Sequence, residues 1–437
     1  MIKHALLAAV AFALHGEINR LVRQPYMDEL FHVPQLRRFC AGDFDPANYD
    51  PKLTTPPGLY LISRVWHLLL PCDSLPLVRA VNLVFLFGAL ALMSPGRRSG
   101  LVFFPPAFFF YFLYYTDAAS TFFILLAYQL LSNARYSMAA LACVVATMVR
   151  QTNIVWALFI ALLAGTRIID GRNGTQFSSA PLSSFTPATF PRFLLDFVWS
   201  SIVSLPVLLR KLWAFLALFL GFALFLLVNR GIVLGIVLPQ RQITIVSGDR
   251  ENHVASLHLV HVLYFAVILF GFTLPVIRLP RALRSPFLHT LALTALALVV
   301  HKYTIEHPFL LSDNRHYTFY IWRYAFRLVP WLRYAAVPVY SFCLHLLVGE
   351  LHSVSALTTL FYAACVAITL VPSPLLEFRY YVIPYYLYRL QLPEVNSRAW
   401  AAEQLLFAAV NAFTFGMFLY RPFEWPSEPG VEQRFMW

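Results

Sequence analysis

ALLAAVAFALHGEINRL, residues 5–21, is the first of a series of long apolar segments, and this series decides the fold class. Hydrophobic residues make up 59% of the 437-residue chain and charged residues only 12%, with a mean hydropathy of +0.65. Soluble domains contain about 25% charged residues. A helix needs about 17–25 mainly apolar residues to cross the hydrocarbon core of a bilayer. The chain is therefore predicted to be an all-α, polytopic transmembrane protein.

The apolar segments predict about twelve membrane spans in a single membrane domain, 1–437. The spans centre near residues 5–21, 78–94, 101–116, 119–133, 137–149, 152–165, 212–229, 258–275, 287–303, 329–348, 354–372 and 403–420. The first segment has no small-residue cleavage site before Gln24, so we expect it to remain as an anchor. Arg64 and His67 interrupt the apolar residues 58–70, which is typical of a helix that lies along the membrane interface.

The basic residues of the short loops predict the orientation, because such residues gather on the cytosolic side. They are Arg97, Arg98, Arg135, Arg278, Arg281 and Arg284. The loop 22–77 then faces away from the cytosol, and the segment 166–211, which has a Ser/Thr/Pro-rich portion, is expected to be cytosolic. The formal glycosylation acceptor Asn173-Gly174-Thr175 is therefore expected to be idle. The net charge of +12 suits cytosolic loops beside anionic headgroups, and no basic motif that would read nucleic acid is present.

The five cysteines show neither a CxxC pair nor a Cys/His metal spacing, so a zinc site is not expected. Cys40 and Cys72 share the first non-cytosolic loop. Two alternatives are open for them, a disulfide and two free thiols.

The segment PYMDELFHVP, residues 25–34, places Asp28 and Glu29 directly after the first apolar segment, with His32 close behind. Asp and Glu total only 21 residues in this chain, so an acidic pair beside a membrane needs a reason. One interpretation is a solvated loop that happens to be acidic. However, the aromatic and Pro-rich residues 44–60, FDPANYDPKLTTPPGLY, follow closely and indicate an ordered loop. An ordered acidic loop at a membrane surface predicts a site.

Four further polar clusters interrupt the apolar sequence, and ionisable residues at membrane depth are costly enough to suggest function. They are YYTD with Tyr115 and Asp117, RQTN with Arg150 and Gln151, HPFLLSDNRHYTFYIW with Asp313, Asn314, Arg315 and His316, and EFRYY with Glu377, Arg379 and Tyr380. The alternatives are helix-ending carboxylates, arginines that reach for headgroups, and an interfacial aromatic belt. An arginine offers a planar fork that matches phosphate oxygens.

The twelve-span topology brings all five clusters to one face of the membrane. A carboxylate base, an arginine for an anion and aromatic side chains for a sugar, all at the lipid boundary, favour a transferase with a lipid phosphate donor. A transporter would be expected to show broken helices or an internal repeat, and neither is found. A binding protein with a decayed site is disfavoured by the intact acids.

The five polar clusters, the segment 44–60 and the terminal QRFMW resemble the dolichyl-phosphate-glucose α-1,2-glucosyltransferases of the endoplasmic reticulum, essentially from end to end. The resemblance implies the GT-C fold and the addition of the terminal glucose to the diglucosylated lipid-linked oligosaccharide used for N-glycosylation. Two departures from the family pattern occur. Residues 236–247 are an extra segment directly before Gly248-Asp249-Arg250, so the match at Asp249 and His253 is affected. In addition, Phe378 stands where the family tends to have Pro.

The implied substrates are dolichyl-phosphate-glucose as donor, the dolichyl-pyrophosphate-linked oligosaccharide as acceptor, and membrane lipid around both. A β-linked donor and an α-linked product imply inversion, with a carboxylate taking the proton of the acceptor hydroxyl. Asp28 is the expected base, and Glu29 is the alternative or a partner that orients acceptor hydroxyls. No DxD-like motif is present, so neither a metal nor another cofactor is expected.

The other roles follow from the same resemblance, with the active site expected to face the lumen. Donor phosphate contacts are expected from Arg379, Arg315 and His316. Sugar and acceptor contacts are expected from His32, Tyr115, Asp117, Arg150, Gln151, Asp313, Asn314 and Tyr380. A mannosyl donor is the nearest alternative, since the residues alone do not distinguish the two sugars.

Overall fold

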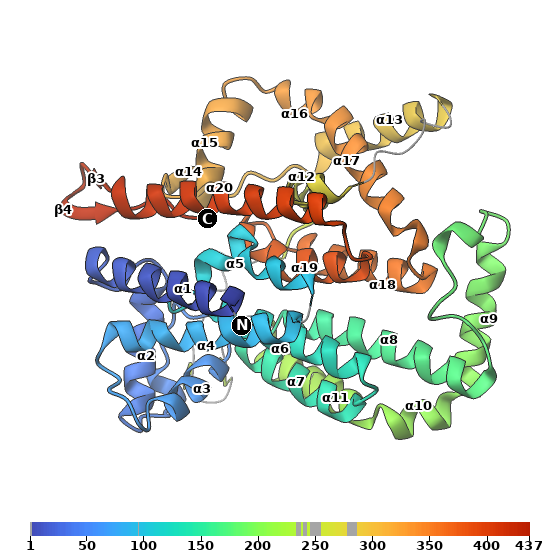
Figure 1. Cartoon of the computed structure of the whole chain (residues 1–437), viewed down its shortest axis with the longest axis horizontal. Coiled ribbons are helices and arrows are strands. Elements are labelled where there is room, and N and C mark those ends of the chain that lie inside the picture. Colours follow the sequence, from blue (N-terminus) through green and yellow to red (C-terminus); the bar gives the residue numbers. More distant parts are fainter. Residues whose placement is uncertain (1, 95, 233–236, 239–242, 245–254, 278–285) are drawn as a thin grey trace.

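The computed structural model describes residues 2–94, 96–232, 237–238, 243–244, 255–277 and 286–437. Nearly all of the regular structure in these residues is helical (Figure 1). Asp249 and His253, most of the segment 236–247, and the arginines 278, 281 and 284 lie outside the described residues. The all-α prediction is confirmed in its main point, a helical membrane protein.

The first part of the chain builds the helices that surround the acidic segment. They are α1 (Ile2–Leu21), α2 (Glu29–Cys40), η1 (Pro46–Asn48), α3 (Gly58–Trp66), α4 (Leu75–Met93), η2 (Arg97–Phe103), α5 (Pro105–Phe110), α6 (Thr116–Ser132), α7 (Tyr136–Val149) and α8 (Asn153–Asn173). Helices α6, α7 and α8 pack against one another in sequence (Figure 1).

The middle of the chain continues with shorter helices. They are η3 (Leu182–Ser184), α9 (Phe190–Val203), α10 (Leu205–Lys211), α11 (Trp213–Asn229), the strands β1 (Val237–Leu238) and β2 (Ile243–Thr244), α12 (Val260–Thr273), η5 (Leu274–Val276) and α13 (Pro286–Tyr303). Thus the segment 166–211, expected as a loop, holds the end of α8 and two helices. Its side of the membrane stays a prediction.

The last part carries the remaining site segments. Its elements are α14 (Pro308–Ser312), α15 (Tyr317–Ile321), η6 (Trp322–Phe326), α16 (Leu332–Ala335), α17 (Val337–Glu350), η7 (Leu351–Ser353), α18 (Ala356–Leu370), η8 (Phe378–Tyr381), α19 (Val382–Gln391), α20 (Ser397–Tyr420) and the antiparallel strands β3 (Phe423–Trp425) and β4 (Glu428–Gln433). Neither strand pair was expected from the sequence.

Four helical segments among the described residues are long and apolar enough to cross a membrane, and the bent pair α9–α10 would make a fifth. They are Leu75–Met93, Asn153–Asn173, Leu332–Ser353 and Ser397–Tyr420. Each expected span overlaps a helix, but the span 101–116 is not continuous. Pro105 and Pro106 start a new helix there, because proline cannot donate the backbone hydrogen bond that would continue the previous one.

The loop 22–77 is folded tightly onto the helices. Cys40 at the end of α2 is bonded to Cys72, just before α4, so the disulfide alternative is the one found. The expected interfacial helix is α3, which starts at Gly58. A Cβ on Gly58 would lie 2.4 Å from the backbone oxygen of Met148 in α7, closer than real Cβ atoms approach. Glycine at this position therefore lets α3 rest against the end of α7, next to Arg150.

After α20 the chain forms the β3–β4 hairpin and returns to the start of the loop 22–77. The backbone N–H of Arg434 donates to the hydroxyl of Tyr26 at 2.7 Å, and that hydroxyl donates to the carbonyl of Arg434 at 2.6 Å. The guanidinium of Arg434 donates to the carbonyls of Phe418 and Leu419, which end α20. These contacts fix the segment 434–437 beside Asp28.

Candidate active site

Asp28 immediately precedes α2, and its backbone position is set by the conformation of Met27 and by a hydrogen bond to Tyr115. Met27 adopts a left-handed conformation with φ 56°, which is uncommon for a residue other than glycine and is often found at functional sites. The hydroxyl of Tyr115 accepts a hydrogen bond from the N–H of Asp28 at 3.1 Å. An Asp at this position usually caps the helix, but the Asp28 carboxylate makes no capping bond. It is therefore free to face the pocket.

The pocket beside Asp28 has a volume of about 230 Å³ and is built from segments far apart in the sequence. Its polar lining comes from Asp28, Tyr115, Ser312, Asp313, His316, Thr318, Glu377 and Arg379, and its apolar lining from Met27, Phe110, Phe309, Leu310, Leu375, Leu376, Met436 and Trp437. Residues from four of the five sequence clusters thus meet at one cavity.

Arg379 is the centre of the charged groups in this pocket. Its Nη1 donates to Oδ2 of Asp28 at 2.6 Å, and its Nε donates to the carboxylate of Glu377. The same Nη1 lies 4.0 Å from Oδ2 of Asp117. The guanidinium also stands over the ring of Tyr115, 5.8 Å from its centroid. Three carboxylates therefore surround one cation.

Arg150 extends the cluster from the opposite side of Asp117. Its Nη1 donates to Oδ1 of Asp117, and its guanidinium lies 5.9 Å from the ring centroid of Tyr380. Oδ2 of Asp117 is buried and accepts no hydrogen bond from the protein. Two arginines thus share the charge of Asp28, Glu377 and Asp117, which leaves the cluster with one more carboxylate than guanidinium groups. A cluster of this kind can accept a proton or position a hydroxyl.

The surroundings keep Asp28 ionised. Burial would raise the pKa of its carboxyl, but the charge of Arg379 and the hydrogen bond from Arg379 bring the pKa below its usual value. The Asp28 side chain keeps 36% of its surface exposed, so it remains accessible from the pocket. An ionised, accessible carboxylate suits a proton acceptor.

Glu29 points away from the pocket although it follows Asp28 directly. Its carboxylate is fully buried and receives Nε of Arg79 at 2.9 Å and Nη2 of Arg79 at 2.6 Å. The backbone N–H groups of Tyr26 and Tyr114 donate to the same carboxylate at 3.0 and 2.7 Å. All its accepting capacity is therefore used inside the protein, between α1, α4 and α5. This geometry indicates that Glu29 stabilises the fold and does not contact a substrate in the pocket.

His32 lies one helical turn after Asp28 and is buried. Its Nδ1 and the hydroxyl of Tyr60 form a hydrogen bond of 2.6 Å. Burial is the main reason that its pKa falls to about 4, and the nearby charges of Arg379 and Arg150 act in the same direction. His32 is therefore neutral at pH 7 and lies behind Asp28, outside the residues that line the cavity.

Asp313 and His316 form part of the pocket wall, and residues 313–316 are bound to the segment 423–437. Asp313 receives Nε and Nη2 of Arg315 at 2.8 and 2.7 Å, and Arg315 also donates to Gln433 at 3.1 Å. Oδ1 of Asn314 accepts from the indole of Trp425 at 2.7 Å. Asp313 and His316 line the pocket, whereas Arg315 and Asn314 do not.

His316 joins this wall to the end of the segment 434–437. Its Nδ1 is 2.9 Å from the carbonyl oxygen of Trp437, and its Nε2 is 3.9 Å from Oδ2 of Asp313. The indole of Trp437 packs against Phe378, with ring centroids 5.0 Å apart. Trp437 therefore connects His316 to the segment that carries Arg379.

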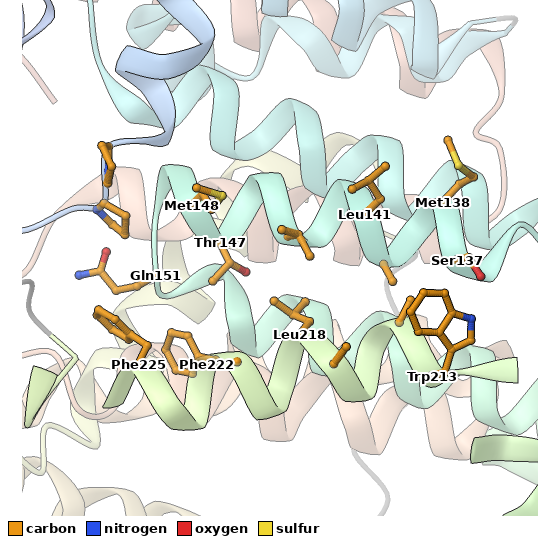
Figure 2. A pocket seen from close by; sticks show the side chains of 17 residues that line it. Ser137, Met138, Leu141, Thr147, Met148, Gln151, Trp213, Leu218, Phe222 and Phe225 are labelled. Carbon is orange, nitrogen blue, oxygen red and sulfur yellow. The ribbon is translucent and has the colours of Figure 1, made fainter. Parts of the chain in front are cut away.

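Gln151 lies apart from the pocket. Its Nε2 donates to the carbonyl of Thr54 at 2.8 Å, and its side chain closes one end of a separate apolar groove between α7 and α11 (Figure 2). Only the neighbouring Arg150 reaches the charged cluster.

Sequence reasoning did not assign a role to Glu377, Arg79 or Trp437. Glu377 stood beside Arg379 in the EFRYY motif, and an acid two residues from an arginine was an available signal. Arg79 was a second signal, since it interrupts an apolar segment. For Trp437 the signal was only its place in a motif. Its neighbours in space come from distant parts of the chain.

No group of three His, Cys, Asp or Glu side chains within the described ranges is arranged to hold a metal ion. Metal independence stays a prediction.

Comparison with known proteins gives a consistent set of relatives. The model of the DIE2/ALG10 family matches residues 22–390. A human Dol-P-Glc:Glc(2)Man(9)GlcNAc(2)-PP-Dol alpha-1,2-glucosyltransferase is 33% identical over 98% of this chain and 96% of its own length. Proteins with the same name from Arabidopsis thaliana (32% identical, 96% of each chain) and Drosophila melanogaster (33%, 94% and 93%) are also similar. No solved structure matches.

Proposed function

Because this chain belongs to the DIE2/ALG10 family, we propose that it transfers glucose from dolichyl-phosphate-glucose to the diglucosylated lipid-linked oligosaccharide. The product carries a terminal α-1,2-linked glucose. The chain is a membrane-embedded hexosyltransferase of the N-glycosylation pathway. The observation that carries the proposal is a pocket in which a carboxylate, Asp28, faces an arginine, Arg379, in a chain related end to end to α-1,2-glucosyltransferases.

Asp28 is the proposed general base. The acceptor hydroxyl oxygen attacks C1 of the glucose, and the bond from C1 to the phosphate oxygen breaks on the opposite side of the ring. The proton of the hydroxyl passes to the Asp28 carboxylate, and the electron pair leaves with dolichyl phosphate. A single displacement of this kind inverts the anomeric centre. At neutral pH the Asp28 carboxylate is ionised and can take the proton, and displacement of Arg379 by the donor phosphate would strengthen it as a base.

Arg379 is the proposed partner of the leaving phosphate. A guanidinium that is already desolvated and oriented by Glu377 stabilises the charge that develops on the phosphate oxygen. His316, which lines the same pocket, is the second proposed phosphate contact. Arg315 is bonded to Asp313 through two nitrogens, so it acts on the phosphate at longer range.

Glu29 supports this arrangement without taking part in the reaction. Its ion pair with Arg79 and its bonds to Tyr26 and Tyr114 hold the backbone just before Asp28 and tie it to the segment between α5 and α6. Asp117, Arg150 and Tyr380 form the proposed sugar-binding side of the cluster. The buried Oδ2 of Asp117 is available for a sugar hydroxyl.

The proposed architecture is a GT-C fold with about twelve spans in the endoplasmic reticulum membrane, and with the pocket on the lumenal side. The disulfide between Cys40 and Cys72 supports this orientation, because disulfides form in the oxidising lumen and seldom in the cytosol. The pocket residues Met27 and Asp28 belong to the same loop, 22–77.

The test is an assay of the purified protein with dolichyl-phosphate-glucose and dolichyl-phosphate-mannose, each with the diglucosylated acceptor lipid. We expect one hexose to be added from the glucose donor, in a linkage that an α-1,2-specific glucosidase removes. Transfer from the mannose donor at the same rate would overturn the donor assignment, and no transfer from either would overturn the function.

A further inference from the structure

A long apolar groove runs between α7 and α11, and its volume is about 800 Å³. Figure 2 shows that Ser137 and Trp213 lie at one end and Gln151 and Phe225 at the other. The groove follows α7 for its whole length, which for 14 residues is about 21 Å at 1.5 Å per residue. This is about two-thirds of the thickness of a bilayer's hydrocarbon core.

Small residues on α11 keep the groove open. Ala217 and Gly221 line the groove and are one helical turn apart on α11. A Cβ on Gly221 would meet no atom within 4 Å, so the space above this glycine is free of protein atoms. The rims are large and apolar, and Leu141 and Trp213 leave 54% and 61% of their surface exposed. The shape is that of a channel for a flexible hydrocarbon chain.

The end of the groove at Gln151 adjoins the charged cluster. Pro56 and Pro57 border this end, and Gln151 is fixed there by its bond to the carbonyl of Thr54. The preceding residue in the chain, Arg150, donates to Asp117, whose second oxygen is 4.0 Å from Arg379. An apolar chain that leaves the groove at this end would therefore emerge next to Arg150, at the edge of the charged cluster.

The chemistry of the two lipid substrates decides which one fits. In the donor, the glucose C1, the phosphate and the first isoprene unit are joined in sequence, so the lipid chain must begin at the reaction centre. In the acceptor, the reacting hydroxyl lies at the far end of an oligosaccharide, remote from the pyrophosphate and its lipid. Only the donor requires an apolar path that starts at the charged cluster.

We propose that the groove between α7 and α11 binds the polyisoprenoid chain of the donor, which leaves the groove at its Gln151 end, toward Arg379. This inference rests on the proposed function. Lipid tails are as apolar as the groove, so the gain over the bilayer is small and the groove mainly orients the donor. Bulk lipid would fill the groove equally well in the absence of a donor, and the test must distinguish these occupants.

The first experiment fills the groove. Gly221→Trp places an indole into the open space, and Gly271→Trp in α12 is the matched control, since a Cβ there also meets nothing within 4 Å and this glycine does not line the groove. Each variant is assayed with a full-length dolichyl donor and with a glucose donor whose chain has only two isoprene units. Equal melting temperature and monodispersity to wild type establish that both variants fold.

With the full-length donor, we expect Gly221→Trp to lower kcat/KM by roughly ten- to a hundredfold, because a displaced chain no longer orients the donor for reaction. With the short donor, which leaves most of the groove empty, the loss in Gly221→Trp should be much smaller, and Gly271→Trp should match wild type with both donors. An equal loss with both donors, or no loss with the full-length donor, would overturn the inference.

The second experiment does not depend on glucose transfer or on a variant that folds. A polyisoprenyl phosphate with a photoreactive group in its chain is bound to the wild-type protein, irradiated and mapped by mass spectrometry. Labels on residues of α7 and α11 that dolichyl phosphate removes by competition would support the inference, and labels confined to other helices would overturn it. Labelling without glucose transfer in the assay would refute the proposed function alone.

Discussion

Nη1 of Arg379 lies 2.6 Å from Oδ2 of Asp28, so the proposed phosphate ligand and the proposed base are paired with each other. When a donor phosphate enters, it joins the three carboxylates around the guanidinium, and the bond to Asp28 competes with the new one. Glu377 holds Nε of the same arginine and keeps the group in place during this exchange. Binding of the donor and release of the base are therefore coupled through one side chain.

We expect Asp28→Asn to abolish transfer, because the amide keeps the shape of the side chain but accepts no proton at neutral pH. Loss of a general base lowers rates by about 10² to 10⁴. The measurement is kcat at saturating donor and acceptor. Asp73→Asn, whose carboxylate in the same loop is 96% exposed, is the control and should keep wild-type turnover. More than half of wild-type turnover in Asp28→Asn would remove Asp28 from this role.

Arg379→Ala should impair use of the donor specifically. A hydrogen bond to a charged group is worth about 1.5–3 kcal/mol, so kcat/KM for the donor should fall by one to two orders of magnitude. Arg379→Lys should recover part of the loss through its charge but lack the bidentate geometry. Steady-state series with each substrate varied separately measure the effect. A change confined to acceptor kinetics would assign Arg379 to the acceptor side.

Glu29→Gln should destabilise the protein, because it leaves the buried Arg79 guanidinium without its counter-charge. Breaking a buried ion pair in this way costs about 3–5 kcal/mol. Asp73→Asn, which breaks the exposed pair of Arg37 and Asp73, is the control, since an exposed ion pair contributes little to the free energy of unfolding. Thermal unfolding in detergent gives the measurement. A stable Glu29→Gln protein that has lost turnover would return Glu29 to the chemistry.

The sequence predicted which segments gather at the site, but not how each side chain would be used. Asp28, Arg379, Asp313 and His316 were expected together and do line one pocket. Asp28 and Glu29 could not be separated, because their difference depends on Arg79, 50 residues away on α4. The break at Pro105 was missed because residues 101–116 were interpreted as one apolar run. The hairpin β3–β4 was missed because its short polar segment was interpreted from composition alone.

The low pKa of His32 predicts a loss of stability in acid. The folded protein keeps His32 neutral down to a pKa of about 4, whereas the unfolded chain protonates it near 6.5. Between these values the unfolded state binds more protons, so the free energy of unfolding falls as the pH decreases. From pH 7 to pH 5 this amounts to about 2 kcal/mol. His32→Gln should lose less stability over the same range, and an identical pH dependence would contradict the assignment.

Reduction of the Cys40–Cys72 disulfide should loosen the loop that carries Asp28. The bond joins residues 32 positions apart, and removing a disulfide costs about 2–4 kcal/mol. We expect a lower melting temperature and lower turnover after treatment with a reductant. The double variant Cys40→Ser, Cys72→Ser should show both effects without reductant and no further change with it. Sensitivity to reductant that persists in the double variant would point to another cause.

The bonds between Tyr26 and Arg434 join residues 408 positions apart, and this has a consequence for biosynthesis. At about 5–20 residues per second, the ribosome needs roughly 20–80 s to pass from one to the other. During this interval Asp28 has already entered the membrane environment, but the wall formed by Met436 and Trp437 has not been made. The nascent chain therefore carries an open, acidic half-site until residues 434–437 have been made.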